Sequence, residues 1–332
     1  MKTKISITTG FLIGAALLFF AFRNVDFAGL LAVYLKANAL FIIPFVFICF
    51  LELFFRAARW RLLLNTSKPV RLWDAFRLEA AGLALSNILP LRLGEIARGA
   101  LGAKIFGIPA LTVFATILVE RTLDIIVLFF MFAAAAYFGG ITGGFLNCGQ
   151  WLWALFAGLV AAMAALVFAD ELIAHRWFSD FFARFPAVRR FFERVAMGVK
   201  GFHSLKSGAL IFVFAFLQWF LDVFNYYLMA LAFGLEGAID IFRAVALLFT
   251  GAAAASIPGP PGYFGNFEFA LAKVLERYGI GREIALAYAS YMHMLGYILV
   301  TLLGVFFVYQ MGHSLGKVWG EFSGKETNRI KD

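Results

Sequence analysis

Residues 86–95 read SNILPLRLGE, and residues 256–268 read SIPGPPGYFGNFE. In both stretches an apolar run stops at proline, and a new helix is expected to start close to an acidic residue, Glu95 or Glu268. Interrupted backbone is tolerated at membrane depth only where protein or a watery cavity satisfies the freed amide groups. One such break in each half of a chain is typical of the binding site of a membrane transporter. We therefore predict that the chain moves a substrate across a bilayer.

The composition around these breaks is that of a membrane protein. The chain has 332 residues, of which 63% are hydrophobic and only 15% are charged, with a mean hydropathy of +0.86. A soluble domain has about 45–50% apolar and about 25% charged residues. No polar stretch is long enough to fold separately, so we predict a single membrane domain over residues 1–332.

Hydrophobic runs of about 20 residues predict full spans. We expect them near residues 5–22, 39–63, 109–138, 151–169, 207–233 and 284–311. The two proline breaks lie in further segments, 73–106 and 241–280, each long enough to enter the membrane and return. The predicted fold is an all-α polytopic membrane protein with about eight hydrophobic segments, namely six full spans plus two broken or re-entrant hairpins.

Basic residues predict the orientation of these segments. They cluster at 56–77 and 176–206, whereas the loop 139–150 carries no charge. Because basic loops stay in the cytoplasm, both clusters and both termini are expected there. The net charge of +9 is therefore no sign of nucleic-acid binding. Residues 170–206 mix Phe and Trp with Arg, which favours a cytoplasmic amphipathic loop in the headgroup layer over the alternative of an ordinary solvated loop.

The two halves of the sequence are related by an ungapped offset of 173 residues, which places Glu95 on Glu268 and Glu120 on His293. The halves are expected to enter the membrane from opposite sides. We therefore predict an inverted-topology repeat, the architecture of many secondary transporters. The predicted repeats are A, about 39–138, and B, about 207–311.

Charged side chains inside the predicted segments mark the candidate site, because each costs roughly 2.5–3.5 kcal/mol to insert into a bilayer. After each proline a helix N-terminus is exposed near the membrane midplane, and such an end binds anions, phosphate especially. Glycines let a headgroup approach the backbone closely, and arginine donors match phosphate. The candidate substrate-binding residues are Asn87, Arg92, Glu95, Arg98, Glu120, Arg121, Asp124, Gly262, Gly265, Glu268 and His293.

Each of these assignments has a structural alternative. Glu95 and Glu268 would also serve as caps of their own helix N-termini. The charged group at 120–124 would also form a self-neutralising ion cluster between helices. His293 would also be a satisfied interior histidine.

The sequence shows no constellation for chemistry. Nucleophile, P-loop and metal-binding motifs are absent from it, and its four histidines show no metal-ligand spacing. We therefore expect no enzyme activity, no cofactor and no metal site. Arg59 and Trp60, close to the end of the second span, are expected to anchor that span at the membrane interface.

Four motifs in order resemble one known family. Residues 55–64 read FRAARWRLLL, residues 87–98 read NILPLRLGEIAR, residues 120–124 read ERTLD, and residues 258–268 read PGPPGYFGNFE. They are similar to the R-W-x-x-L-L, P-x-R-x-G-E-x-x-R, E-R-x-x-D and P-G-x-x-G-x-x-E segments of the lysylphosphatidylglycerol synthase transmembrane region. Members of this family are also called flippase-like or UPF0104 proteins. The resemblance covers roughly residues 5–315.

The resemblance implies a lipid-translocating membrane domain, the part of aminoacyl-phosphatidylglycerol synthases that flips the product lipid. The soluble aminoacyl-transferase domain of those synthases has no counterpart in this sequence, so synthase activity is not expected. The family often has arginine where this chain has His293.

Residues and resemblance together predict a lipid flippase in the cytoplasmic (inner) membrane of a prokaryote. Its substrate would be an anionic or phosphate-bearing lipid, such as a modified phospholipid, a glycolipid or a polyprenyl-phosphate lipid. The expected partners are membrane lipids, without nucleic acid. Two alternatives stay open: a secondary transporter for a small solute or ion, and a non-catalytic membrane partner of a separate lipid-modifying enzyme.

Overall fold

The computed structural model is built from helices, without a strand among the residues that it describes. These residues are 12, 14–23, 25–89, 93–140, 149–168, 184–186, 188, 189, 193, 204–257 and 260–312. The predicted amphipathic loop at 170–206 lies mostly outside them.

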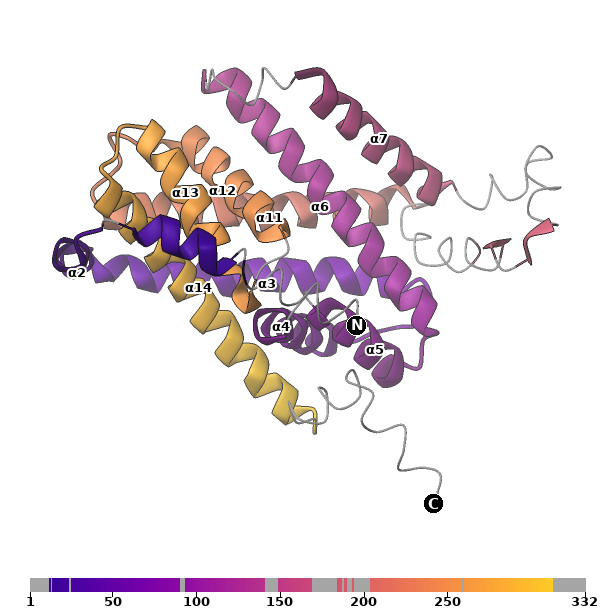
Figure 1. The fold of residues 1–332 in the computed structure, drawn as a ribbon. Coiled ribbons are helices and arrows are strands. Elements are labelled where there is room, and N and C mark those ends of the chain that lie inside the picture. Colours follow the sequence, from indigo (N-terminus) through magenta and orange to yellow (C-terminus); the bar gives the residue numbers. More distant parts are fainter. Residues whose placement is uncertain are drawn as a thin grey trace.

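The first half of the chain consists of helices of different lengths, with the first break between α4 and α5 (Figure 1). They are α2 (Phe27–Lys36), η1 (Ala39–Phe41), α3 (Ile42–Leu64), α4 (Leu72–Ile88), α5 (Leu93–Phe106), α6 (Ala110–Phe138) and α7 (Gly149–Val167). The second half contains α11 (Leu205–Ala232), α12 (Ile241–Ser256), η4 (Pro261–Tyr263), α13 (Asn266–Arg277) and α14 (Arg282–Gln310).

Three continuous helical stretches are both long enough and apolar enough to cross a membrane, namely Ala39–Leu64, Leu205–Ala232 and Arg282–Gln310. They contain 26, 28 and 29 residues. At about 1.5 Å per residue each exceeds the hydrocarbon thickness of about 30 Å. They lie where spans were predicted near 39–63, 207–233 and 284–311. The chain is an all-α polytopic membrane protein, whereas the number of its spans stays a prediction.

The first predicted span does not continue as one straight helix. Helix Gly14–Phe22 is followed by α2 at an angle of 86°. The two helices are long and apolar enough to cross a membrane only when they are counted together as one bent span. Asp26 explains the restart, because its Oδ1 accepts the N–H of Ala28 at 3.0 Å and so caps α2. The helix Gly14–Phe22 thus ends where the predicted span 5–22 ends, and α2 is an additional helix that the sequence did not predict.

Both predicted breaks are present. Helix α4 ends at Ile88 and α5 starts at Leu93, while Pro90 and its two following residues lie outside the described part of the chain. Helix α12 ends at Ser256, and α13 starts only at Asn266. Within the described residues, one α-helix ends and another begins on either side of each stretch, as the proline signals predict. Their placement at membrane depth stays a prediction.

The two halves repeat the same order of helices. The 173-residue offset carries the start of α5 onto the start of α13, and the start of α6 to within one residue of the start of α14. The packing is also reciprocal, because α4 packs on α14, α12 packs on α6, and α3 packs on α11. Figure 1 shows α6 crossing from α5 towards α12, with α7 along its outer side. The inversion of the two halves relative to a membrane stays a prediction.

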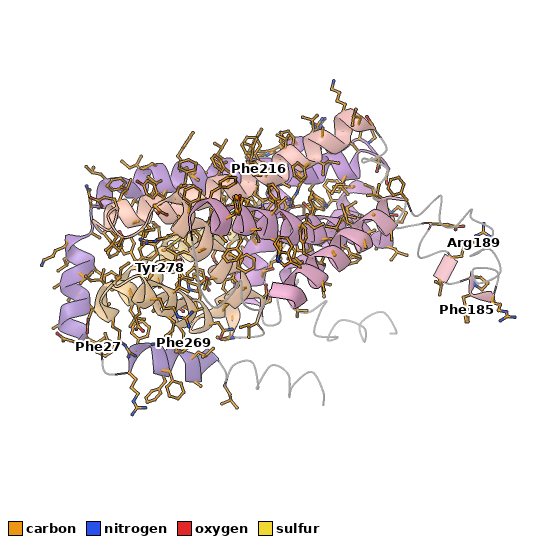
Figure 2. The ribbon with its side chains drawn as sticks, turned by 90° about the horizontal axis from the view of Figure 1, so that it is seen from above. Phe27, Phe185, Arg189, Phe216, Phe269 and Tyr278 are labelled. Atoms are coloured by element: carbon orange, nitrogen blue, oxygen red, sulfur yellow. The ribbon has the colours of Figure 1, made fainter. Side chains whose placement is uncertain are left out.

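The outer surface of the helices is strongly apolar, as the many aromatic side chains in Figure 2 illustrate. On α3, Ile43 is 71% exposed and Phe47 is 66% exposed. On α14, Leu302 is 66% exposed and Phe306 is 59% exposed. Spacings of four residues place each pair on one face of its helix. Such continuous apolar faces fit contact with lipid chains.

Candidate functional site

Arg59 of α3 is the centre of a buried ion network. Its side chain is fully buried, with Nη1 donating to Asp124 Oδ1 at 2.6 Å and Nη2 donating to Glu120 Oε1 at 3.4 Å. Both carboxylates belong to α6. The indole N–H of Trp219 on α11 also donates to Asp124, at 3.0 Å. The carboxylate of Asp124 therefore links Arg59 in the first half of the chain to Trp219 in the second half.

Arg98 of α5 extends the network to α4. Its Nη2 donates to Glu120 Oε2 at 2.8 Å, and its Nη1 donates to Glu79 of α4. The guanidinium also lies over the ring of Trp60, 4.6 Å from the centroid. The absence of a side chain at Gly82 leaves room for this arrangement, because a Cβ there would lie 2.9 Å from Arg98 Cβ. Four helices are thereby joined by charged hydrogen bonds.

Arg121 forms the open end of the network. Its Nε lies 3.4 Å from Glu95 Oε1, and its Nη1 lies 3.4 Å from Asp124 Oδ2. The side chains of Arg121 and Glu95 are 32% and 35% exposed, whereas the other partners in the network are buried. Glu95 lies in the first turn of α5, directly after the first break. The network thus ends at the break, where protein covers it least.

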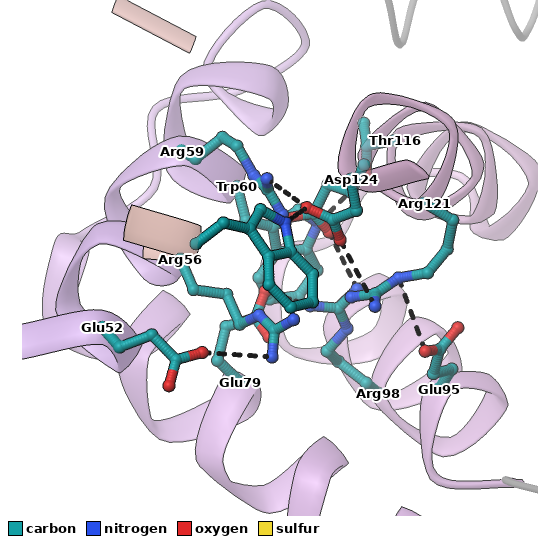
Figure 3. A network of polar contacts seen from close by, with 12 residues as sticks. Glu52, Arg56, Arg59, Trp60, Glu79, Glu95, Arg98, Thr116, Arg121 and Asp124 are labelled. Atoms are coloured by element: carbon teal, nitrogen blue, oxygen red, sulfur yellow. Dashed lines mark hydrogen bonds and ion pairs between the residues drawn. The ribbon is translucent and has the colours of Figure 1, made fainter. Parts of the chain in front are cut away.

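The ion pairs form one chain of alternating charge, shown in Figure 3. It runs in the order Glu79, Arg98, Glu120, Arg59, Asp124, Arg121 and Glu95. A second pair lies beside it in the same view, in which Arg56 and Glu52 of α3 are 4.0 Å apart. An uncompensated charge in such a setting costs several kcal/mol, about 3–5 when one partner is removed.

The structure corrects the interpretation of Arg59 and Trp60 as interface anchors. Both side chains are 0% exposed. Trp60 Nε1 donates to Thr116 Oγ1 at 3.0 Å, so its polar atom faces α6 rather than the membrane surface. Arg56, also assigned to the basic cytoplasmic cluster, is 6% exposed. Arg59 and Arg56 lie in the interior because acidic partners are present there, and Trp60 lies there with Thr116 as the acceptor of its N–H.

Glu79 in the network and Glu52 in the pair beside it are acids that were not among the predicted site residues. Glu79 lies in the apolar run FRLEAAGLAL, and Glu52 lies four residues before Arg56 in the apolar run of α3. An isolated acid within an apolar helix is the signal that was available for both.

The second break is held by Glu268 and His293. Glu268 Oε2 accepts the N–H of Gly265 at 2.6 Å and so caps the start of α13, as the acidic half of a capping box does. Its Oε1 lies 2.6 Å from His293 Nδ1 on α14. The capping alternative is thus confirmed for Glu268. Glu95 is instead paired with Arg121.

The glycines of the second break have close neighbours. Gly262 has φ +69°, and a Cβ there would lie 2.6 Å from Tyr297 Cε2. Gly265 has φ +91°, and a Cβ there would lie 2.2 Å from the carbonyl oxygen of Gly14. Both positions therefore need glycine for backbone conformation and packing. Contact of either glycine with a headgroup stays a prediction.

The two breaks meet at Asn87. Its Nδ2 donates to Thr301 Oγ1 of α14 at 3.0 Å, and its Oδ1 accepts the hydroxyl of Tyr263 at 3.3 Å. Tyr263 belongs to η4 within the second break. The apposition of Glu95 and Glu268 across a shared cavity stays a prediction, and Arg92 lies outside the described residues.

Comparison with known proteins shows to which family the chain belongs. The family model described as "Lysylphosphatidylglycerol synthase TM region" matches residues 7–304. The chain belongs to this family. It is also 25% identical over 278 residues to a "UPF0104 membrane protein" of Methanothermobacter thermautotrophicus strain Delta H, covering 76% of this chain and 78% of the relative. No solved structure gives a significant match.

The residues that the family model matches include both breaks and every member of the ion network. Among the described residues, no group of three His, Cys, Asp or Glu side chains is arranged to hold a metal ion. The arrangement offers charged recognition and hydrogen bonding at two interrupted helices. It therefore suits binding of a charged group inside an apolar protein.

Proposed function

We propose that this protein is a lipid translocase of the cytoplasmic membrane of a prokaryote, with both termini in the cytoplasm. It moves an anionic or phosphate-bearing lipid, of the modified phospholipid, glycolipid or polyprenyl-phosphate type, and it catalyses no chemical reaction. Family membership supports a lipid-related role. The observation that carries the proposal is the partly exposed Arg121 at the end of a buried ion network, directly beside a helix break.

Arg121 is suited to receive an anionic headgroup. Its two ion pairs measure 3.4 Å, longer than the buried pairs Arg59–Asp124 at 2.6 Å and Arg98–Glu120 at 2.8 Å. A phosphate oxygen replaces Glu95 on Arg121 with little loss, because guanidinium donors match both groups in geometry. The N-terminus of α5 adds a positive dipole end at the same place.

The buried remainder of the network keeps this site in position. Asp124 contacts both Arg121 and Arg59, so the receiving guanidinium is held by groups that are themselves fixed by charged hydrogen bonds. The apolar faces of α3 and α14 give lipid chains a path along the outside while the headgroup moves through the polar interior. This division of headgroup and chains favours a lipid over a small solute.

The two alternatives predict different observations. A solute or ion transporter would show flux of a water-soluble substrate in vesicles of fixed lipid composition. A membrane partner of a lipid-modifying enzyme would co-purify with that enzyme and move no lipid alone. The proposed partners of the translocase are the membrane lipids themselves.

Replacement of Arg121 tests the headgroup contact. In Arg121→Gln we expect anionic lipid to bind about ten- to a hundredfold more weakly, because a charge-assisted pair worth roughly 1.5–3 kcal/mol is lost. Native mass spectrometry of the protein with its co-purified lipids measures the bound fraction. The expected wild-type spectrum contains a retained anionic lipid that the variant has mostly lost.

Arg77→Gln is the matched control. Arg77 is also a partly exposed arginine in an ion pair, with a side chain 24% exposed and with Asp74 as its partner. It is outside the network, so the variant should keep the wild-type lipids. Equal loss of lipid from both variants would show that any removed positive charge weakens binding, and it would contradict a specific role for Arg121.

A further inference from the structure

The Glu268–His293 pair is buried at the second break and has an incomplete set of partners. The two side chains are 2% and 6% exposed, and they meet at 2.6 Å through Oε1 and Nδ1. The other ring nitrogen, His293 Nε2, is buried without a hydrogen-bond partner among the described residues. A buried polar atom left in this state needs a reason. Exchange of a proton is one, because imidazole is the side chain whose charge changes most readily near neutral pH.

Aromatic rings surround the imidazole and separate it from bulk solvent. Tyr263 stacks on it with centroids 5.7 Å apart at 9°, and Phe264 and Phe267 lie 4.6 Å and 4.7 Å away. In such surroundings the protonated pair is neutral as a unit, with imidazolium beside carboxylate. The deprotonated pair carries one negative charge, which the N–H of Gly265 and the start of α13 stabilise. Both charge states thus have a structural basis.

The charged and titratable groups that face the pair from neighbouring elements are few. Tyr34 of α2 lies close enough to interact electrostatically with Glu268, and its hydroxyl is 2.5 Å from Ser290 Oγ on α14. Tyr263 approaches from η4 and Tyr297 from α14 itself. Asn87 of α4 is neutral. In the described part of the chain, no other charged side chain forms an ion pair with Glu268 or His293.

The pair also contacts the residues of the second break that reach the first. Glu268 fixes the positive-φ residue Gly265, and His293 stacks on Tyr263, which has φ +51° and is therefore itself strained. The hydroxyl of Tyr263 reaches Asn87 at the first break. A change of charge at the pair therefore acts on the contact that joins the two breaks.

We propose that Glu268 and His293 form the binding site of a coupling proton, so that lipid movement is driven by a proton gradient. The inference rests on the proposed function and names its energy source. In the deprotonated state the neutral imidazole keeps its Nδ1–H on Glu268 Oε1, and the coupling proton binds at the unpartnered Nε2, which makes the imidazolium beside the carboxylate. No other co-reactant takes part, because a single proton enters from one side of the membrane and leaves to the other.

A titration of the histidines tests the proton site without any transport. We expect nitrogen NMR of 15N-histidine-labelled protein to show a signal that changes protonation state between pH 5 and pH 9. This signal should be lost in His293→Gln, retained in the control His203→Gln, and shifted in Glu268→Gln. A His293 signal that keeps one protonation state over this range would contradict the proposal. If His293→Gln fails to fold, the other three proteins still decide the result.

Lipid translocation under a pH gradient tests the coupling. A gradient of about one unit is a tenfold difference in proton activity. In liposomes we expect it to change the wild-type and His203→Gln rates several-fold, in opposite senses for opposite gradients. His293→Gln should move lipid at one rate under both gradients. Wild-type translocation that ignores the gradient would contradict the coupling and leave the proposed function intact, whereas no translocation at all would contradict both.

Discussion

Arg59→Ala is expected to lower the free energy of unfolding by about 3–5 kcal/mol, because it leaves buried carboxylates without their shared cation. Glu120 and Asp124 both contact Arg59 and are 0% and 3% exposed. Arg98 and Arg121 would compensate only in part, since each is already engaged with a further acid. Unfolding of the purified protein in a detergent titration, followed by tryptophan fluorescence, measures the change.

Two variants control this prediction. Arg59→Lys keeps the charge but loses the planar donor fork, so it should lie between Ala and wild type. Arg77→Ala removes a partly exposed ion pair with Asp74 and should cost less than about 1 kcal/mol. If Arg59→Ala were no more harmful than Arg77→Ala, the network would not hold the helices together, and the interpretation of Arg59 as its centre would be wrong.

Gly304→Ala is expected to destabilise the protein by about 1–3 kcal/mol or more, because it overpacks the contact between α14 and α4. A Cβ at position 304 would lie 2.1 Å from the carbonyl oxygen of Ala80 and 2.4 Å from Ala84 Cβ. Small residues at such contacts let membrane helices approach closely. The same unfolding titration measures the effect.

Gly296→Ala supplies the matched control on the same helix. A Cβ at position 296 has nothing within 4 Å, so the change should stabilise α14 by up to about 1 kcal/mol through helix propensity. Opposite signs for the two substitutions would show that α14 approaches α4 at Gly304 as described. Equal effects would argue against that close contact.

The positions of the breaks and of three spans could be predicted from the sequence because local signals determine them. Proline ends a helix wherever it falls in the fold. Long apolar runs likewise gave the second span to within one residue of the observed Ala39–Leu64. The 173-residue offset was visible for the same reason, since it compares the order of such signals. The bend at Asp26 was missed because a single capping carboxylate in a short polar stretch gives a weak signal.

The partners of the charged residues could not be predicted in this way. Arg59 finds its acids on a helix more than sixty residues later in the chain. Local composition around Arg59 and Trp60 resembles that of an interface anchor, and only the position of α6 distinguishes the two environments. Likewise, the contact between Glu268 and His293 depends on how α13 packs against α14. Periodicity within one segment carries no information about such contacts.

Translocation of a labelled anionic phospholipid in liposomes tests the central claim most directly. Vesicles with the wild-type protein are expected to move the label between leaflets faster than protein-free vesicles, and Arg121→Gln should be at least about tenfold slower, in line with the lost charge-assisted contact. Arg77→Gln should match wild type. Wild-type rates equal to those of protein-free vesicles, for a panel that includes phospholipid, glycolipid and polyprenyl-phosphate probes, would contradict the account.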